Sequence, residues 1–488
     1  MKDKLNTAFD NVDDEYIAKT SGVPKKSRAT KIAVIAAALA AVVVVSFSAG
    51  ALLSRIGKNG ITDPVNTDRT PEDTKQAETK SDETEEEPDV TQEPFKGETG
   101  NYSGAKYVSL ADPIKKMITA RHDHNFRMNE YNEYCERLAS FYDELSGKLL
   151  SGDKSSVISP VNIYMSLSLL AECTDGNSRK EILDVIGAEN IEQLRGQTKT
   201  IWAMTCRDST RGKSILTNSI WIDSDMQVKD RCAEYLKNEH MASAFNGDFS
   251  DPMYINALKQ WLSDMTDGLL DNCINELDIP PDTLAVLAST LYYKARWYNE
   301  YHETEYGKFN GVDCIFNVKK EDDSLIYKGD GFTAYRDLLS DGNYMWFFLP
   351  DEGKTAADVL NVGLISYIDI EEKDCTKYDV TIRMPDFDVD YNENIIDKIA
   401  KLGINECMDI NKADFSALTD GDLYVGEIIH AARFKADKKG VEGAAYTVGT
   451  LLGLSEPRDK YDFNLDRPFV FVVENNGTPL FVGVVNEI

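Results

Sequence analysis

Residues 438–462 read KKGVEGAAYTVGTLLGLSEPRDKYD and lie between an expected strand at 424–434 and an expected closing hairpin. From Gly440 to Leu454 this segment contains no proline, lysine or arginine. A segment of this length without secondary structure of its own is uncommon in a compact domain and is usually functional. We therefore predict that residues 438–462 form an exposed functional loop.

In an extended conformation this loop has two different faces, because successive side chains of a strand point to opposite sides. One face carries small residues and the other carries bulkier or charged ones: Val441, Gly443, Ala445 and Thr447 against Glu442, Ala444, Tyr446 and Val448. A proline-free segment with one compact face can join the middle of a sheet. A flexible Gly/Ala linker is the alternative, but a linker has no reason to alternate in this way.

The chain around the loop mixes helices and strands. Apolar spacing predicts helices at 163–185, with a break near 174–177, and at 255–270 and 392–402. Strands are expected at 214–222, 283–293, 344–349, 379–384, 424–434 and 468–473. Because no regular βαβ alternation appears, we predict an α+β fold with mostly antiparallel sheets.

Several motifs in this part of the chain resemble the serpin family, in the family's order. They are SSVISPVNIYMSLSLLAECTDGNSRKEIL at 155–183, LAVLASTLYYKARW at 284–297, IIHAARFKADKKGVEGAA at 428–445 and FNLDRPFVFVV at 463–473. The resemblance covers about residues 125–488. It implies the serpin fold, with a large central sheet, surrounding helices and an exposed reactive-centre loop at about 438–462, within a serpin domain at 105–488.

The resemblance also implies a mechanism, which is suicide-substrate inhibition of serine proteases. A protease attacks the loop and forms an acyl-enzyme, and the cut loop then inserts into the central sheet before water can release the protease. The family's spacing beyond Gly440 places the reactive bond between Leu454 and Ser455, with Leu452 or Leu451 as alternative positions. The hinge that enters the sheet would consist of Gly440, Val441, Glu442, Gly443, Ala444, Ala445, Tyr446 and Thr447.

The expected partner is a target serine protease held in a covalent acyl complex by a monomeric chain that is not itself an enzyme. Leucine at the attacked position favours chymotrypsin-, elastase- or subtilisin-like proteases, because a trypsin-like primary pocket carries an Asp. A non-inhibitory serpin that serves as a surface-displayed scaffold or binding protein is the alternative. Val441 and Ala445 argue against that alternative, whereas Lys439 and Tyr446 favour it.

An enzyme that acts at the cell surface is a further alternative, but the sequence contains no catalytic signature and predicts no cofactor. A metal site is not predicted either, because His122 and His124 have no nearby ligand cluster and the calcium-loop-like run Asp386–Asp390 is followed by Tyr391 in place of Gly. His430 lies in the apolar run EIIHAARF and is typical of a hydrogen-bonded core histidine.

The N-terminal part of the chain has a different character. Residues 32–53 read IAVIAAALAAVVVVSFSAGALL, without a single charge, and a helix of this length spans roughly 33 Å. More basic residues precede this run than follow it, so we predict a single-pass signal anchor in the lipid bilayer, with residues 1–31 in the cytoplasm and the remainder outside the cell. A signal peptide cleaved near 46–50, which would release a secreted protein, is the alternative.

Residues 54–104 are rich in Thr, Glu, Asp and Pro, and we expect them to form an acidic, disordered stalk. The whole chain of 488 residues carries 53 basic and 83 acidic residues, a net charge of −30. Such an acidic chain is not expected to bind nucleic acid, which needs clustered Lys and Arg. The eight cysteines are too sparse for a disulfide-stapled scaffold. We therefore interpret the protein as a membrane-anchored bacterial serpin.

Overall fold

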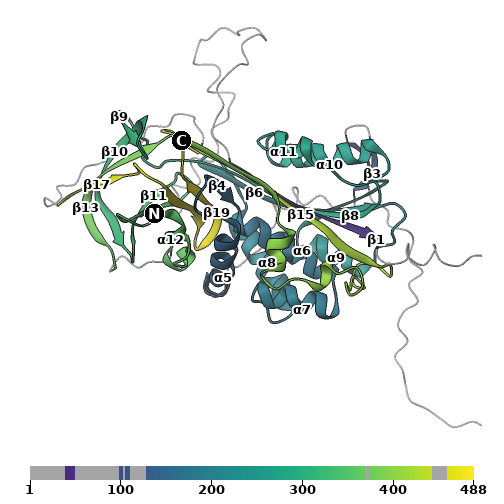
Figure 1. Ribbon diagram of the computed structural model, residues 1–488. Helices are drawn as coiled ribbons and strands as arrows, with labels where there is room; N and C mark the ends of the chain where they lie inside the picture. Colours follow the sequence, from purple (N-terminus) through teal and green to yellow (C-terminus); the bar gives the residue numbers. More distant parts are fainter. Residues whose placement is uncertain (1–38, 50–97, 103–104, 110–127, 369–373, 442–458) are drawn as a thin grey trace, which may run out of the picture. The chain divides into compact units, whose positions relative to one another are not determined.

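The computed structural model describes residues 39–49, 98–102, 105–109, 128–368, 374–441 and 459–488. Contacts divide the chain into residues 1–36 and residues 37–488, and every described residue belongs to the second unit. Two large sheets and the helices around them form this unit (Figure 1), as the α+β prediction requires.

The first sheet, called the central sheet below, has the strand order β14-β15-β1-β8-β6-β7-β3-β2, with β16 paired to β8 and β5 paired to β6. Its neighbours are antiparallel except β6 and β7. The strands are β1 (Leu39–Ala49), β2 (Glu98–Tyr102), β3 (Ala105–Ser109), β5 (Arg207–Ser209), β6 (Gly212–Asp223), β7 (Ala242–Gly247), β8 (Thr283–Arg296), β14 (Phe387–Asn394), β15 (Leu423–Ala436) and β16 (Gly440–Val441).

The second sheet has the order β17-β13-β10-β11-β12-β18-β19-β4, with β9 paired to β10. Its closing hairpin turns at Asn476 and Gly477, which both have positive φ, as a two-residue Asn-Gly hairpin turn requires. The strands are β4 (Ser156–Ile158), β9 (Glu303–Phe309), β10 (Val312–Lys328), β11 (Phe332–Leu338), β12 (Tyr344–Pro350), β13 (Thr376–Pro385), β17 (Lys460–Asn464), β18 (Phe469–Asn475) and β19 (Thr478–Val485).

Several of the helices begin after a residue whose side chain stabilises the helix N-terminus. Asp175, Asn190 and Asp251 each accept a hydrogen bond from a backbone N–H of the first turn that follows. The helices are α5 (Met128–Leu149), α6 (Pro160–Cys173), α7 (Gly176–Val185), α8 (Ile191–Thr205), α9 (Asp230–Asn238), α10 (Pro252–Met265), α11 (Asp271–Glu276), α12 (Ala356–Leu360) and α13 (Ile396–Ala400), with 3₁₀ turns η1 (Leu364–Tyr367) and η3 (Glu406–Met408).

Helices cover both faces of the central sheet. Helices α6, α7, α8 and α9 lie on one side, and α10 and α11 lie on the other (Figure 1). The apolar side chains accordingly form two clusters, a large one that includes α6 and a smaller one that includes Leu258 and Trp261 of α10. The strands in the middle of the sheet are therefore buried on both faces.

Strand β1 differs from the sequence prediction, since it occupies the middle of the run that we expected to form a transmembrane helix at 32–53. Residues 39–49 are a strand, and the other residues of that run lie outside the described part. No helix in the described ranges is long and apolar enough to cross a bilayer. The physical reason is that a strand buried on both faces also reads as a continuous apolar run, and the β-branched Val42–Val45 favour the strand.

Two smaller differences concern element boundaries. Residues 98–102, which we expected at the end of a disordered stalk, form β2, whereas residues 54–97 lie outside the described residues. Of the helix predicted at 392–402, only α13 is observed, because β14 extends to Asn394. Residues 387–390 of the run Asp386–Asp390 belong to β14, and Asp386 directly precedes that strand, so the run does not form a calcium-binding loop.

Candidate functional site

The candidate site is the base of the predicted reactive loop together with the strand position beside it in the central sheet. Strand β15 ends at Ala436, and a tight turn follows in which Asp437 and Gly440 exchange backbone hydrogen bonds of 3.2 and 3.3 Å. The Asp437 carboxylate also accepts a hydrogen bond of 2.7 Å from the Lys439 backbone N–H. This turn directs the chain back along the sheet.

Gly440 and Val441 form the two-residue strand β16, which pairs antiparallel with the end of β8, opposite Arg296 and Ala295. Gly440 has a φ of +118°, and a Cβ at this position would overlap the backbone of Arg296. Only glycine fits such a left-handed residue in close backbone contact. The first two residues of the loop are therefore already part of the sheet.

Residues after β8 hold this turn in place. The indole Nε1 of buried Trp297 donates a 2.8 Å hydrogen bond to the Asp437 carbonyl. The backbone N–H of Tyr301 donates a 3.1 Å hydrogen bond to the carbonyl of Lys438. The start of the loop thus depends on contacts with a segment more than a hundred residues earlier in the chain.

At the other end of the loop, β17 pairs parallel with β13 in the second sheet. The Arg383 guanidinium connects three strands there, with contacts of 2.8 Å to Asp462 and 2.7 Å to Glu305. Both ends of the predicted loop are thus anchored in sheets, one in each.

The structure describes only part of the predicted site. Gly440 and Val441 lie in β16 as stated. The other predicted hinge and reactive-bond residues lie outside the described residues: Glu442, Gly443, Ala444, Ala445, Tyr446, Thr447, Leu451, Leu452, Leu454 and Ser455. The metal-ligand candidates His122 and His124 also lie outside them.

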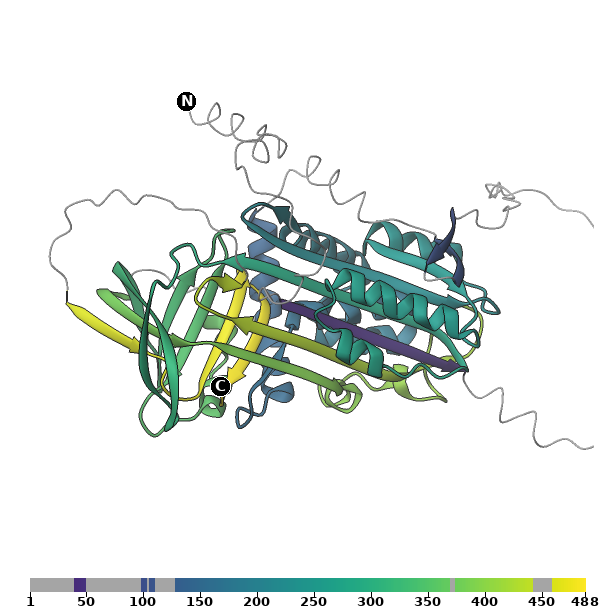
Figure 2. The same ribbon diagram turned by 90° about the horizontal axis from the view of Figure 1, so that it is seen from above.

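Strand β1 fills the position between β8 and β15 (Figure 2, purple) and pairs antiparallel with both. Its register along β8 runs from Leu39 opposite Tyr293 to Ser48 opposite Thr283. Because each backbone edge of β1 is paired with a neighbouring strand, β1 is an integral strand of the sheet. We did not predict this role from the sequence, although the four consecutive valines at 42–45 favour a strand.

The side chains of β1 are buried on both faces of the sheet. Ala41, Val43, Val45 and Phe47 belong to the large cluster, and Phe47 makes an edge-to-face contact with Phe415 at 5.2 Å. Ala40, Val42 and Val44 belong to the smaller cluster beneath α10 and α11. A continuous apolar run suits this environment.

His430 of β15 connects β1 to the N-terminus of α6. Its Nε2 accepts a 3.2 Å hydrogen bond from the Ser159 backbone N–H, so its Nδ1 carries the proton and donates to the Val42 carbonyl at 3.1 Å. Burial lowers the pKa of His430 to about 3, although the hydrogen bond to Val42 opposes this shift. The imidazole is therefore neutral at physiological pH, which confirms the prediction of a hydrogen-bonded core histidine.

Comparison with known proteins assigns this arrangement to a family. A family model described as "Serpin (serine protease inhibitor)" matches residues 137–488. The chain belongs to the serpin family. Serpin-Z2A of Oryza sativa subsp. japonica is 25% identical over 417 residues, covering 72% of this chain and 96% of that protein. Members of this family are generally protease inhibitors rather than enzymes.

Solved structures show the same fold. The native state of the thermophilic serpin Tengpin matches with a TM-score of 0.64 and 21% identity, over 73% of this chain and 94% of that one. Arabidopsis AtSerpin1, in a conformation titled native stressed, matches with a TM-score of 0.61 and 22% identity, over 72% and 98% of the two chains. The predicted serpin fold is thus confirmed.

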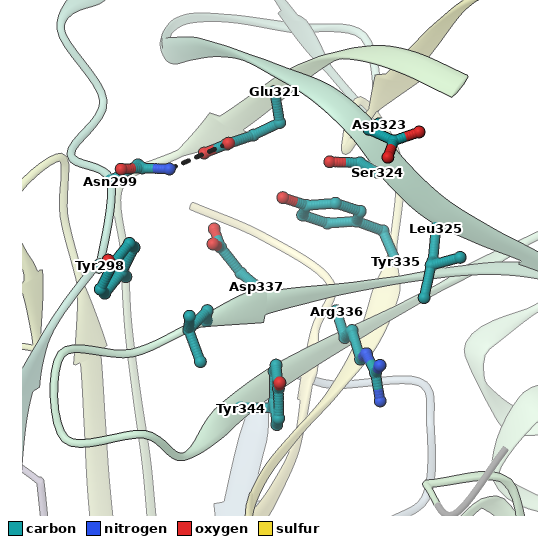
Figure 3. Close-up of a pocket in the computed structure, with 11 residues that line it drawn as sticks. Tyr298, Asn299, Glu321, Asp323, Ser324, Leu325, Tyr335, Arg336, Asp337 and Tyr344 are labelled. Carbon is teal, nitrogen blue, oxygen red and sulfur yellow. Dashed lines mark hydrogen bonds between the residues drawn. The ribbon is translucent and has the colours of Figure 1, made fainter. Parts of the chain in front are cut away.

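A pocket of about 350 Å³ in this serpin lies on the second sheet (Figure 3). Its acidic groups already have partners. Asp337 accepts hydrogen bonds from Lys319 at 2.6 Å and from Tyr301 at 3.0 Å, and Glu321 accepts one of 3.0 Å from Asn299. With its acidic groups paired in this way, the pocket gives no reason to assign a ligand.

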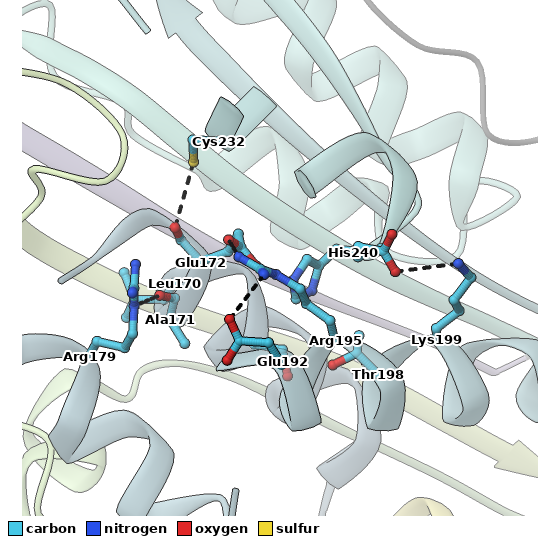
Figure 4. Close-up of polar contacts among 12 residues, drawn as sticks. Leu170, Ala171, Glu172, Arg179, Glu192, Arg195, Thr198, Lys199, Cys232 and His240 are labelled. Carbon is cyan, nitrogen blue, oxygen red and sulfur yellow. Dashed lines mark hydrogen bonds and ion pairs between the residues drawn. The ribbon is translucent and has the colours of Figure 1, made fainter. Parts of the chain in front are cut away.

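A buried ionic network lies under the central sheet of the serpin (Figure 4). The Glu172 carboxylate of α6 accepts two hydrogen bonds from Arg195 of α8, at 2.7 and 2.9 Å, and lies 3.1 Å from His240. Burial raises the pKa of Glu172, but its hydrogen bonds with Arg195 and His240 outweigh this effect and hold the pKa at about 2. The network connects helices of the domain, and the described ranges contain no cluster that could hold a metal ion.

Proposed function

We propose that this serpin is a suicide-substrate inhibitor of serine proteases that uses residues 438–462 as its reactive-centre loop. The observation that carries the proposal is β16. Gly440 and Val441 pair with the end of β8 and lead the chain directly towards the position between β8 and β15. A cut loop that continues this pairing would become a strand of the central sheet.

In the proposed reaction, the protease serine attacks the carbonyl carbon of Leu454. The peptide bond to Ser455 breaks, the new amino group of Ser455 leaves with the C-terminal part, and Leu454 remains joined to the protease through an ester. Insertion of the freed loop then moves the bound protease and distorts it before water can hydrolyse the ester. Leucine fits the apolar primary pocket of chymotrypsin-, elastase- and subtilisin-like proteases.

A second candidate function is a non-inhibitory serpin that acts as a displayed scaffold or binding protein. The observation that favours it is β1, because a chain whose central sheet is already complete has no position for an inserted loop. The two candidates differ in one measurable property, which is whether a covalent complex with a protease forms.

To test inhibition, the full chain is incubated with chymotrypsin, elastase, subtilisin and trypsin, and the products are separated on denaturing gels. We expect an SDS-stable complex with at least one of the first three proteases and none with trypsin. Cleavage at Leu454 without any complex, both in the full chain and in a variant that destabilises β1, would support the scaffold instead.

The position of the reactive bond is tested with Leu454→Arg, and Leu452→Arg serves as the matched control. Leu454→Arg is expected to transfer complex formation to trypsin, because an arginine side chain fits the acidic trypsin pocket. Leu452→Arg should leave the chymotrypsin complex in place. If Leu452→Arg alone transfers specificity, the reactive bond lies two residues earlier.

We also propose a location, on the basis of charge. Five basic residues between Lys19 and Lys31 precede the uncharged run 32–53, which supports a serpin domain that is exported from the cytoplasm. Protease treatment of intact cells tests this proposal, because an exported domain is accessible to added protease and an internal one is protected.

A further inference from the structure

The strand position between β8 and β15 is shared by two segments of this chain. Strand β16 pairs with Arg296 and Ala295 at the end of β8, and β1 pairs with the same edge of β8 from Tyr293 onwards. Both are antiparallel to β8, so they run in the same direction. Strand β1 therefore lies in line with β16, where the continuation of the reactive loop would be.

The registers give the equivalence residue by residue. Gly440 lies opposite Arg296, so a loop that continued the pairing would place Gly443 opposite Tyr293 and Thr447 opposite Ser289. In β1 these two positions are taken by Leu39 and Val43. Each residue of β1 thus has one counterpart in the loop.

The aligned sequences match in character. Residues 39–47 of β1 read LAAVVVVSF, and the loop residues at the same positions, 443–451, read GAAYTVGTL. Two alanines, one valine, a hydroxyl residue and a final large apolar residue coincide. This similarity indicates that β1 presents to β8 and β15 the pattern that the loop would present.

The position has room for one strand only. Strand β1 pairs with β8 on one edge and with β15 on the other. Its side chains from Ala40 to Val45 are at most 4% exposed, under helices on both faces. His430 donates its hydrogen bond to a backbone carbonyl of β1, so this contact does not depend on the side chain that the occupant carries.

We propose that residues 39–49 are a built-in occupant of the strand position between β8 and β15, and that the reactive loop can insert only after they have left it. The consequence of this inference rests on the proposed function. If a protease cuts the loop while β1 is in place, the protease is released and the serpin is consumed as a substrate. The occupancy itself concerns only the sheet. Departure of β1 is then the step that activates the inhibitor.

Two engineered disulfides report which segment is in the position. Val43→Cys with Ser289→Cys forms a β1–β8 disulfide, because these two residues lie directly opposite each other. Thr447→Cys with Ser289→Cys forms a loop–β8 disulfide at the same point when the loop is inserted. The full chain is oxidised with diamide before and after chymotrypsin cuts the loop, and mass spectrometry identifies the linked peptides.

We expect the β1–β8 disulfide within one chain both before and after cleavage, and at least about tenfold less of the loop–β8 disulfide. The substitution Val43→Lys buries an unpaired charge in the large cluster and should drive β1 out of the sheet. In the variant that carries Thr447→Cys and Ser289→Cys, we expect Val43→Lys to raise the yield of the loop–β8 disulfide at least about tenfold after cleavage. Val34→Lys is the matched control, because it adds the same charge to the same apolar run outside β1. It should change neither disulfide.

Inhibition provides the second measurement. Val43→Lys should lower the number of serpin molecules consumed per protease by at least about tenfold relative to the parent, while Val34→Lys should not. A parent chain that inhibits with one molecule per protease overturns the proposal. The proposal is also overturned if, without Val43→Lys, the loop–β8 disulfide forms in the same yield as the β1–β8 disulfide. A β1–β8 disulfide that joins two chains overturns it too.

Failure of the proposed function gives a different result. In that case no SDS-stable complex forms with any variant, yet the disulfides still show whether β1 excludes the cut loop.

Discussion

Replacing Arg195 with methionine should destabilise the serpin domain strongly, because Arg195 neutralises a carboxylate that is almost inaccessible to water. The Glu172 side chain is 2% exposed and that of Arg195 is 13% exposed. The guanidinium also lies over the Tyr235 ring, with 3.4 Å between its central carbon and the ring centroid. Methionine retains most of the apolar volume and removes the charge and both hydrogen bonds to Glu172.

The magnitude follows from the cost of leaving one partner of a buried ion pair alone, about 3–5 kcal/mol. Unfolding entropy of about 2.1 cal/mol/K per residue, taken over the serpin domain at 137–488, gives about 0.7 kcal/mol per degree. The melting temperature at pH 7 should therefore fall by about 4–7 °C.

The pH dependence distinguishes a lost ion pair from a general packing defect. In the parent, the lowered pKa of Glu172 contributes stability above pH 4.5 that is lost as the pH falls towards about 2. In Arg195→Met, burial without Arg195 raises the pKa of Glu172, so that protonation relieves the buried charge. The difference between the two melting temperatures should therefore narrow as the pH is lowered from 7 to 3.5.

The assay is thermal unfolding of the full chain, followed by tryptophan fluorescence at one scan rate and low protein concentration. Lys180→Met is the control, since the Lys180–Asp184 pair is exposed and its loss should cost less than about 1 °C. A fall of less than about 1 °C for Arg195→Met at pH 7, or a difference that does not narrow at pH 3.5, would refute the reasoning.

Two further predictions concern other parts of the fold. Burial raises the pKa of Asp143 to about 6, against hydrogen bonds from Ile365 and Ser366, so its ionisation destabilises the fold. Between pH 4 and pH 7 the melting temperature of the parent should fall by about 3 °C more than that of Asp143→Asn. Equal dependence of the two melting temperatures on pH would contradict this. Gly440→Val should unpair β16 from β8, because its Cβ overlaps the Arg296 backbone, and should raise amide exchange at Val441 at least about tenfold. Gly342→Val has a similar positive φ but no neighbour within 4 Å of its Cβ, so exchange at Val441 should stay unchanged in that control.

Much of this fold can be predicted from the sequence, because local patterns and packing agree. Strands β8 and β15 extend the predicted ranges by only a few residues, and the break predicted at 174–177 separates α6 from α7. The base of the loop also follows, since Gly440 occupies a left-handed position that glycine favours. These features depend on residues that are near one another in the chain.

The rest depends on partners that are distant in sequence. The apolar run containing β1 has the same composition whether it lies in lipid or between two strands, and only the neighbours β8 and β15 decide that it is a strand. The pairing of Glu172 with Arg195 and His240 likewise arises from the packing of α6 against α8 and the chain before β7. A single sequence does not contain these partners in any local pattern.

The position of β1 has a consequence for biosynthesis. Val42 contacts His430, 388 residues later in the chain. At about 5–20 residues per second, roughly 20–80 s pass between synthesis of these two residues. Throughout that time the apolar segment has emerged, but its second neighbouring strand does not yet exist. The earliest part of the sheet to be synthesised is therefore among the last that can be placed, and the nascent chain needs another apolar environment, a chaperone or a lipid surface, for its N-terminal segment until β15 is complete.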